Sequence, residues 1–413
     1  MGGKSIKPIR KRIHVYFLMT AYRKYNKIIK NIYPLLMTFS KKDVTRAGEA
    51  LINDSLLDDH QLLERTMQIL TYWRDSHIQP LNEAHNLLNR FIYRIDKKAF
   101  IAKRLKRFES IKKKLKRFDG MQLKNMQDIG GIRVVVENLK QVNAIFKVLA
   151  NEHCFYNDGK FIKMDNYILN PKNDGYRCLH IVGKFNNKLS EERKIEFQIR
   201  TKLQHSWATT LEIVDIFTGQ DLKSNDGFYD YKKFFKDVSD QFQIIENLKG
   251  FLENDKGQLT KEYLTKVVQS QHLINQCIDI KKFMDRSVGG ITIENHLKTY
   301  CVTLNDLNTV LTAKNNRDGF ILIRLNVQTR QIEHEFFVNS EQTLASERYS
   351  QYEQLLSKDE KWIVALLSTN AIGGLKEAYP NYFADSEIFL SYIGLIKIAA
   401  VLGGARKVTS IAV

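Results

Sequence analysis

Two stretches of sequence decide the fold: DIGGIRVVV at residues 128–136 and RKIEFQIR at residues 193–200. The first is a β-branched run entered through a Gly-Gly turn, which predicts a strand. The second alternates, with apolar side chains on one side and Glu196, Gln198 and Arg200 on the other. Because three polar side chains should not be buried against a plain apolar core, we expect them to line a cleft.

The composition indicates a globular chain with a polyanionic partner. Of its 413 residues, 43% are hydrophobic and 27% are charged, which excludes general disorder and allows two or three domains. The formal net charge of +18 favours nucleic acid, since clustered Lys and Arg release the counterions condensed on a polyanion. A basic surface could also serve an anionic membrane.

The cysteines and the hydropathy pattern favour a cytoplasmic protein. The cysteines are far apart and form no CxxC pair, so neither a zinc site nor a disulfide framework is indicated. No stretch of about eighteen uncharged apolar residues occurs, so we expect no transmembrane helix and no stable membrane association. The four cysteines are Cys154, Cys178, Cys277 and Cys301.

The N-terminal part predicts an extension followed by helices. Residues 1–40 are basic and rich in aromatic residues, which fits either an arm for RNA or membrane or, as we favour, a poorly packed extension. In residues 42–97 the apolar positions recur at helical spacing, with breaks near Asn53 and Asp75 and a new helix at Pro80.

Residues 99–118 carry a dense basic run that predicts a helix. Such a run is often a solvated face. In RLKRFESIKKK, however, a planar cation, a hydroxyl and two ammonium groups can project toward one ligand from adjacent turns, and this set suits an adenine ring and a triphosphate. The side chains are those of Arg104, Lys106, Ser110 and Lys114.

Two carboxylates predict a magnesium site. Asp128 stands just before the first strand, and Glu196 lies on the polar face of the second. Magnesium takes a few carboxylate oxygens and completes its shell with substrate phosphates. Asp128 alone would be read as a turn residue, and Glu196 is the partner that favours a metal ligand.

The loop Pro171–Arg177 joins the two regions and presents an aromatic ring flanked by two cations. Tyr176 can close a hairpin or, beside a phosphate site, stack a nucleobase. No GxxxxGK[ST] sequence is present, which excludes a P-loop enzyme. In the helix expected after the second strand, Trp207 is predicted to be a core residue.

These motifs resemble the synthetase domain of the RelA/SpoT homologues, which transfer pyrophosphate from ATP to a ribose 3′-hydroxyl. RLKRFESIKKK, DIGGIR, NPKNDGYRCLH and EFQIRT carry the resemblance over residues 100–215. It implies that Arg104 and Arg133 sandwich the adenine and that Lys106, Ser110 and Lys114 hold the phosphates. It also implies that Asp128 and Glu196 carry Mg²⁺, with Glu196 a candidate base. Tyr176 would stack the acceptor base, surrounded by Lys172, Arg177, His180, Gln198 and Arg200.

The C-terminal part suggests control of a toxic activity. The chain has no HDxxED hydrolase motif, so it would make a product that it cannot remove. Its layout resembles the CapRel group of toxic small alarmone synthetases, in which a fused pseudo-zinc-finger antitoxin places a YxxY motif over the ATP site and a phage structural protein, from the capsid, releases the block. Tyr379 and Tyr382 in AYPNYF are the matching pair, although from the sequence alone they are better explained as core aromatics at a helix end.

We therefore predict an α+β chain: a mixed-sheet, pyrophosphotransferase-like synthetase domain flanked by helices, and a small α+β regulatory domain. The expected divisions are an extension (1–40), the synthetase (41–250), a helical linker (251–310) and the regulatory domain (311–413). The leading function is pyrophosphorylation of the 3′-hydroxyl of tRNA CCA ends, which would inhibit translation in antiviral defence. The alternatives are synthesis of (p)ppGpp or (p)ppApp, and a non-catalytic RNA-binding protein, against which the intact Asp128 and Glu196 argue.

Overall fold

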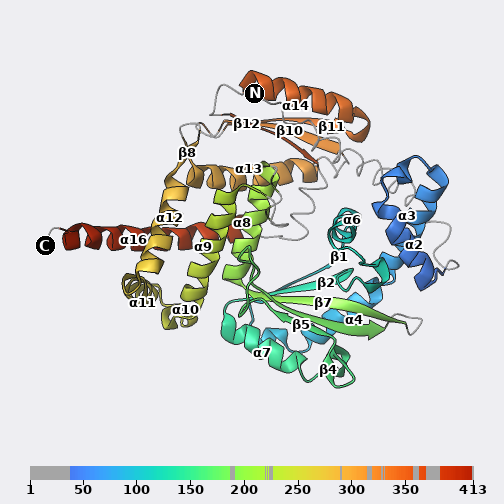
Figure 1. Ribbon diagram of the computed structural model, residues 1–413, viewed down its shortest axis with the longest axis horizontal. Coiled ribbons are helices and arrows are strands. Elements are labelled where there is room, and N and C mark those ends of the chain that lie inside the picture. The colour runs from blue at the N-terminus through green and yellow to red at the C-terminus, as the bar shows by residue number, and fades with distance from the viewer. Residues whose placement is uncertain are drawn as a thin grey trace.

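A five-stranded mixed sheet forms the centre of the computed structural model, which describes residues 38–186, 191–218, 220, 222, 227–288, 291–313, 319–326, 329, 331–356, 362–368 and 382–411 (Figure 1). The strand order is β1-β2-β7-β6-β5; β2 and β7 run parallel and the other neighbours antiparallel. The strands are β1 (Phe100–Leu105), β2 (Gly130–Val136), β5 (Lys163–Asn166), β6 (Leu179–Asn186) and β7 (Glu192–Thr201). The predicted α+β class with a mixed sheet is confirmed.

One face of this sheet is apolar and covered by helices. α4 (Ile78–Asn89), α5 (Ile92–Ile95) and α7 (Leu139–Leu149) pack their buried side chains against it in a single core. The predicted alternation of β7 is confirmed, because its Ile and Phe residues lie in this core. Glu196 and Gln198 project to the opposite face, which is therefore left for a binding site.

Helices beside the sheet frame that second face. α2 (Lys41–Ile52) follows its N-cap residue Ser40, whose side chain forms a capping box with Asp43. α2 and α3 (His60–Asp75) share a core with α6 (Phe108–Arg117). The predicted breaks near residues 53 and 75 are confirmed.

The helix expected over residues 99–118 is wrong in its first half. Residues 100–105 form β1, which pairs with the edge of β2, with Arg104 opposite Gly131. Ile101 and Leu105 pack on the apolar core, while Ala102 and Arg104 line the opposite face. The strand is stabilised by this pairing with a partner distant in sequence, which overrides the helix propensity of the basic run.

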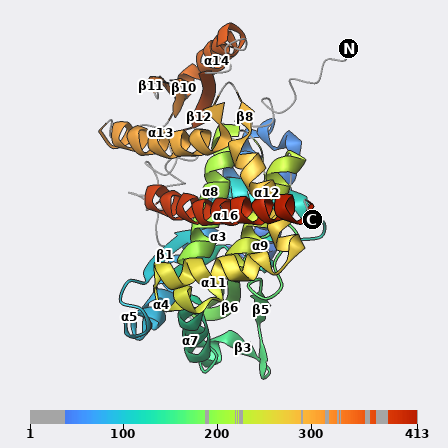
Figure 2. The ribbon, with the colours of Figure 1, turned by 90° about the vertical axis from the view of Figure 1, so that its left-hand side faces the viewer.

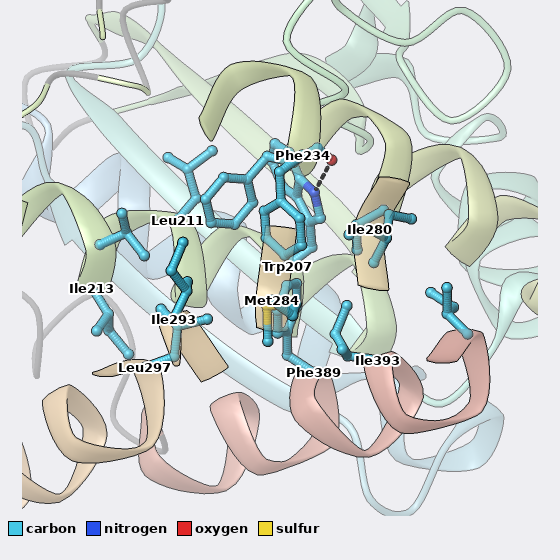
Figure 3. Packing of buried hydrophobic residues seen from close by; sticks show 14 of the residues in the cluster. Trp207, Leu211, Ile213, Phe234, Ile280, Met284, Ile293, Leu297, Phe389 and Ile393 are labelled. Atoms are coloured by element: carbon cyan, nitrogen blue, oxygen red, sulfur yellow. Dashed lines mark hydrogen bonds between the residues drawn. The ribbon is translucent and has the colours of Figure 1, made fainter. Parts of the chain in front are cut away.

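A helical layer adjoins the sheet (Figures 1 and 2). Trp207 from α8 is buried in it as predicted, and its Nε1 donates to the carbonyl of Phe235 at 2.8 Å (Figure 3). Phe389 from the last helix, α16, lies in the same core. The layer comprises α8 (Lys202–Thr218), α9 (Tyr229–Glu246), α10 (Lys249–Leu252), α11 (Lys256–Val268), α12 (Gln271–Asp285), α13 (Ile293–Ala313) and α16 (Tyr382–Ile411).

A three-stranded antiparallel sheet with one covering helix lies beyond α13 (Figure 1). β10 (Gly319–Asn326) and β11 (Gln331–Val338) form a hairpin, α14 (Gln342–Leu356) is a helix, and β12 (Trp362–Ser368) is a further strand. α16 packs mainly on α8 and α12, and it shares one buried cluster with side chains of β10 and β12. The predicted unit of residues 311–413 thus ends in a helix that belongs to the central core. Its pseudo-zinc-finger character stays a prediction.

The remaining short elements connect these layers. They are η1 (Asp54–Leu57), η2 (Leu123–Asn125), η3 (His153–Phe155), β3 (Tyr156–Asn157), β4 (Lys160–Phe161), β8 (Ser287–Val288), β9 (Ile291–Thr292) and η5 (Asn339–Glu341).

One segment of α16, Ala384–Ala405, is long and apolar enough to cross a membrane by length and composition alone. This is weak evidence, because core helices of soluble proteins pass the same test. One side of the segment is buried among the helices of the central core, and its Lys397 donates to Asp285 at 2.6 Å and to Glu294 at 2.7 Å.

Candidate active site

A polar pocket opens on the face of the five-stranded sheet opposite α4, α5 and α7. Its walls come from strands β1, β2 and β7, from Lys106 just after β1 and from Asp128 just before β2. Six residues predicted for the site line it together, namely Arg104, Lys106, Asp128, Arg133, Glu196 and Gln198. Their assembly follows from register, because Gly131 lies opposite Glu196 and Arg133 opposite Gln198 in the parallel pair of strands.

Asp128 lies between two lysines in this pocket. Its two carboxylate oxygens accept from Lys106 Nζ at 2.8 Å and from Lys114 Nζ at 2.9 Å. Burial raises the pKa of Asp128, but the charges of Lys106 and Lys114 outweigh this effect and lower the pKa below its ordinary value. The carboxylate is therefore ionised at neutral pH and held in one orientation.

Glu196 belongs to a chain of hydrogen bonds. Its Oε1 lies 3.2 Å from His180 Nδ1, its Oε2 accepts from Gln198 at 2.7 Å, and the hydroxyl of Tyr176 lies 2.9 Å from His180 Nε2. Burial raises the pKa of Glu196, but His180 and Gln198 outweigh this effect and hold the pKa well below its ordinary value. Burial lowers the pKa of His180, whereas Cys178 and Glu196 raise it, to about 10. An ionised Glu196 beside a protonated His180 is the expected state at neutral pH.

The two carboxylates fit a magnesium ion. They line one pocket, and the negative charge of Glu196 raises the pKa of Asp128, as expected of carboxylates that share a site. No cluster of three or more His, Cys, Asp or Glu residues suited to a metal occurs in the part of the chain that the structure describes. Magnesium needs no such cluster, because it is commonly held by one or two carboxylates with water and substrate phosphates.

Part of the chain is similar to known proteins. Residues 103–213 match the family model described as "Region found in RelA / SpoT proteins". We refer to these matched residues as the RelA/SpoT region. GTP pyrophosphokinase YwaC of Bacillus subtilis is 32% identical over 89 residues, which are 21% of this chain and 40% of that protein. The chain thus matches two-fifths of the length of this curated relative.

Two solved structures are also similar. A GTP pyrophosphokinase family protein from Streptococcus pneumoniae has 24% identity and a TM-score of 0.37, over 45% of this chain and 94% of that one. The small alarmone synthetase 1 of Bacillus subtilis bound to its product pppGpp has 19% identity and a TM-score of 0.37, over 45% and 99% of the two chains.

The loop of the RelA/SpoT region that carries Tyr176 differs in part from its prediction. The ring is half-buried instead of exposed, and one of the two expected cations lies over it, with Lys172 Nζ 5.0 Å from the ring centroid. Tyr167, which the motif reading missed, packs edge-on against Tyr176 at 6.1 Å, with Lys172 Nζ 4.7 Å from its ring. A second tyrosine, four residues before the breaker-rich loop, was the available signal.

Arg177 has bonding partners away from the tyrosine ring. It is 4% exposed, and its guanidinium donates to Ser239 at 2.9 Å, to the carbonyl of Ile168 at 3.0 Å and to Asp240 at 3.0 Å. These bonds fasten the loop of the RelA/SpoT region to α9. The predicted contact of Arg177 with an acceptor stays a prediction that these bonds do not favour.

The other predicted residues lie beside the pocket, away from its lining, or outside the part of the chain that the structure describes. Lys114 reaches the pocket through Asp128, whereas Ser110 is exposed on α6 and is absent from the pocket lining. Arg200 is 1% exposed, at the buried end of the polar face of β7. Tyr379 lies outside the residues that the structure describes. Tyr382 is the first residue of α16, but its side chain is not among those described.

Proposed function

We propose that this protein transfers a pyrophosphate group from ATP to a ribose hydroxyl. The observation that carries the proposal is the convergence of Asp128 and Glu196 in one pocket whose other walls hold the cations of Arg104, Lys106 and Arg133. Polyphosphate needs cations and a metal, while the transferred group needs no covalent nucleophile. The match of this segment to the RelA/SpoT family and its similarity to a GTP pyrophosphokinase support the same reaction.

The reaction balances with the groups present. The acceptor oxygen bonds to the β-phosphorus, the bond from that phosphorus to the oxygen bridging to the α-phosphate breaks, and AMP leaves. Asp128 and Glu196 would hold Mg²⁺, which neutralises charge on the phosphates. Lys106 would bind the triphosphate, Arg104 and Arg133 would hold the adenine, and Glu196 is the candidate base for the attacking hydroxyl.

For the acceptor, we propose the 3′-hydroxyl of the tRNA CCA end. The net charge of +18 supports a polyanion, and Tyr176 with Lys172 offers a surface on which a terminal base can stack. Nine Lys and Arg residues and no Asp or Glu lie in residues 1–37, so this extension supplies a large part of the excess charge. A guanosine nucleotide is the second candidate, favoured by the similarity to a GTP pyrophosphokinase.

We further propose that the C-terminal part restrains the enzyme. In this proposal Tyr379 and Tyr382 cover the adenine site, and a phage capsid protein that binds the C-terminal part exposes it, so that the released enzyme stops translation in infected cells. The proposal rests on the resemblance to fused toxin and antitoxin proteins.

The test uses the purified full chain with ATP labelled in the γ-phosphate, Mg²⁺ and separate acceptors. The acceptors are bulk tRNA, periodate-oxidised tRNA, GDP and GTP, and a Tyr379→Ala/Tyr382→Ala variant is assayed in parallel to relieve any restraint. Label in intact tRNA and none in oxidised tRNA is expected, since oxidation destroys the 3′-terminal ribose. Label only in guanosine nucleotides would remove the tRNA proposal, and absence of transfer to every acceptor by both proteins would remove pyrophosphotransfer.

A further inference from the structure

Asp385 is a buried carboxylate that the C-terminal helix places against the RelA/SpoT region. It stands in the first turn of α16 and is 7% exposed. Its Oδ2 lies 3.3 Å from Nε2 of His205 and accepts from the hydroxyl of Thr209 at 3.5 Å. Both partners belong to α8, which continues directly from β7, so residues about 180 positions apart in sequence meet here.

Two arginines belong to the same buried group. Burial lowers the pKa of His205 well below its ordinary value, and the charges of Arg200 and Arg133 lower it further. Burial raises the pKa of Asp385 to about 6, while Arg200, Thr209, Arg133 and Lys202 act in the opposite direction. A neutral imidazole can donate only through a nitrogen that carries its proton, so the contact with Asp385 assigns that proton to Nε2.

The group lies at the inner end of the polar face of the sheet. Arg133 pairs with Gln198 across β2 and β7, and two residues further along these strands Val135 pairs with Arg200. Arg133 lines the pocket, whereas Arg200 is 1% exposed. A guanidinium buried this deeply needs negative charge nearby, because transfer of an isolated charge from water is costly. The charges of Arg200 and Arg133 act to lower the pKa of Asp385, so its carboxylate lies within electrostatic reach of both guanidinium groups.

The packing of α16 fixes where Asp385 lies. One turn further along the helix, Phe389 is fully buried, with its ring centroid 5.6 Å from that of Phe242 and 6.1 Å from that of Phe235 (Figure 3). Near the far end of its packed part, Lys397 bonds to Asp285 and Glu294. A helix held at both places cannot slide without opening the core.

We propose that Asp385 is a positioning residue of the nucleotide pocket, through which α16 orients His205 and the guanidinium groups of Arg133 and Arg200. This inference rests on the proposed function, because it assumes that Arg133 contacts the nucleotide. It makes the C-terminal helix a component of the site. A segment from outside residues 103–213 thereby completes the RelA/SpoT region.

The test compares three variants of the full chain: Asp385→Asn, Asp385→Glu and Glu387→Gln. Glu387 is exposed on the same helix, so Glu387→Gln removes the same charge without touching the buried group. Equilibrium binding of a non-hydrolysable ATP analogue with Mg²⁺ is measured by calorimetry, and melting temperature is recorded alongside. We expect Asp385→Asn to weaken analogue binding about tenfold, Asp385→Glu to recover part of the loss, and Glu387→Gln to bind as the unaltered protein does.

Several outcomes would overturn the inference. An Asp385→Asn protein that melts lower yet binds the analogue normally would show that Asp385 has a purely structural role. Equal losses in Asp385→Asn and Glu387→Gln would point to general electrostatics. If Asp385→Asn does not fold, His205→Gln removes the imidazole that the carboxylate contacts, and unchanged binding in that variant would refute the proposal. Failure of the unaltered protein to bind the analogue would instead remove the proposed function, and the inference with it.

Discussion

Asp128→Asn tests whether the carboxylate between two lysines is a metal ligand of the reaction. The change keeps the shape of the side chain and removes one negative charge. It leaves Lys106 and Lys114, whose Nζ atoms lie 2.8 and 2.9 Å from the carboxylate oxygens, without the anion that separates them. In the substrate complex, it would remove one of the two carboxylates proposed for Mg²⁺.

The expected loss of kcat depends on which role Asp128 has. Removal of an electrostatic group that acts in the transition state lowers kcat by roughly 10²- to 10³-fold, or about 3 to 4 kcal/mol. Asp128 is also a partly buried counter-charge, and the two lysines left close together should cost some stability as well. If Asp128 served only that second role, ATP phosphates would replace it as the counter-charge, and kcat would fall little.

The assay is transfer of γ-labelled phosphate at saturating ATP over a series of Mg²⁺ concentrations. We expect Asp128→Asn to lose at least 10²-fold in kcat and to require more Mg²⁺ for half-maximal rate, because one ligand is missing. Asp119→Asn, which changes an exposed carboxylate just beyond α6, is the matched control. Turnover within a few-fold of normal at unchanged Mg²⁺ dependence would refute the metal assignment.

Three other substitutions address the acceptor, the core and a buried carboxylate. Tyr176→Ala should weaken acceptor binding by about 1 to 3 kcal/mol if a base stacks there, as measured by the KM for acceptor; an unchanged KM would restrict Tyr176 to its bond with His180. Phe389→Ala should lower the free energy of unfolding by about 3 to 5 kcal/mol in urea titrations, whereas Ile398→Ala, at an exposed position of the same helix, should change it by no more than about 0.5 kcal/mol. Burial raises the pKa of Glu246 from 4.5 to about 7, so the folded protein retains a proton that the unfolded chain releases, and the free energy of unfolding should fall by up to about 3 kcal/mol as pH rises from 4.5 through 7. Glu246→Gln should remove that dependence, and an identical pH profile in the variant would show that another group causes it.

Local patterns predicted the polar face of the sheet. The alternation in residues 193–200 has the period of a strand, so it places Glu196 and Gln198 on one side whatever the rest of the chain does. The capping box at Ser40 is local in the same way. Residues 100–105 show the limit of such reasoning, because their strand depends on pairing with β2 and their basic side chains read equally well as a helix face.

Side-chain direction in the loops could not be predicted. Arg177 follows Tyr176 directly, and the sequence suggests that both face one ligand. The guanidinium instead bonds to Ser239 and Asp240, 62 and 63 residues away along the chain, and no local period encodes that contact. The pairing of His205 with Asp385 was missed for the same reason, since neither residue belongs to a motif with recognisable spacing.

The position of α16 changes what a restraint by the C-terminal part can be. Its buried side lies in one core with α8 and α9, so removal of the helix would expose Phe234, Phe235 and Phe242 together with the contacts of His205. Deletion of the C-terminal part would therefore damage the pocket as well as remove the proposed restraint. The segment with Tyr379 joins this helix directly, three residues before Tyr382 and six before Asp385. A trigger that moves this segment would act at the end of α16 that carries the carboxylate, so release of the pocket and the orientation of His205 would be coupled through one helix terminus.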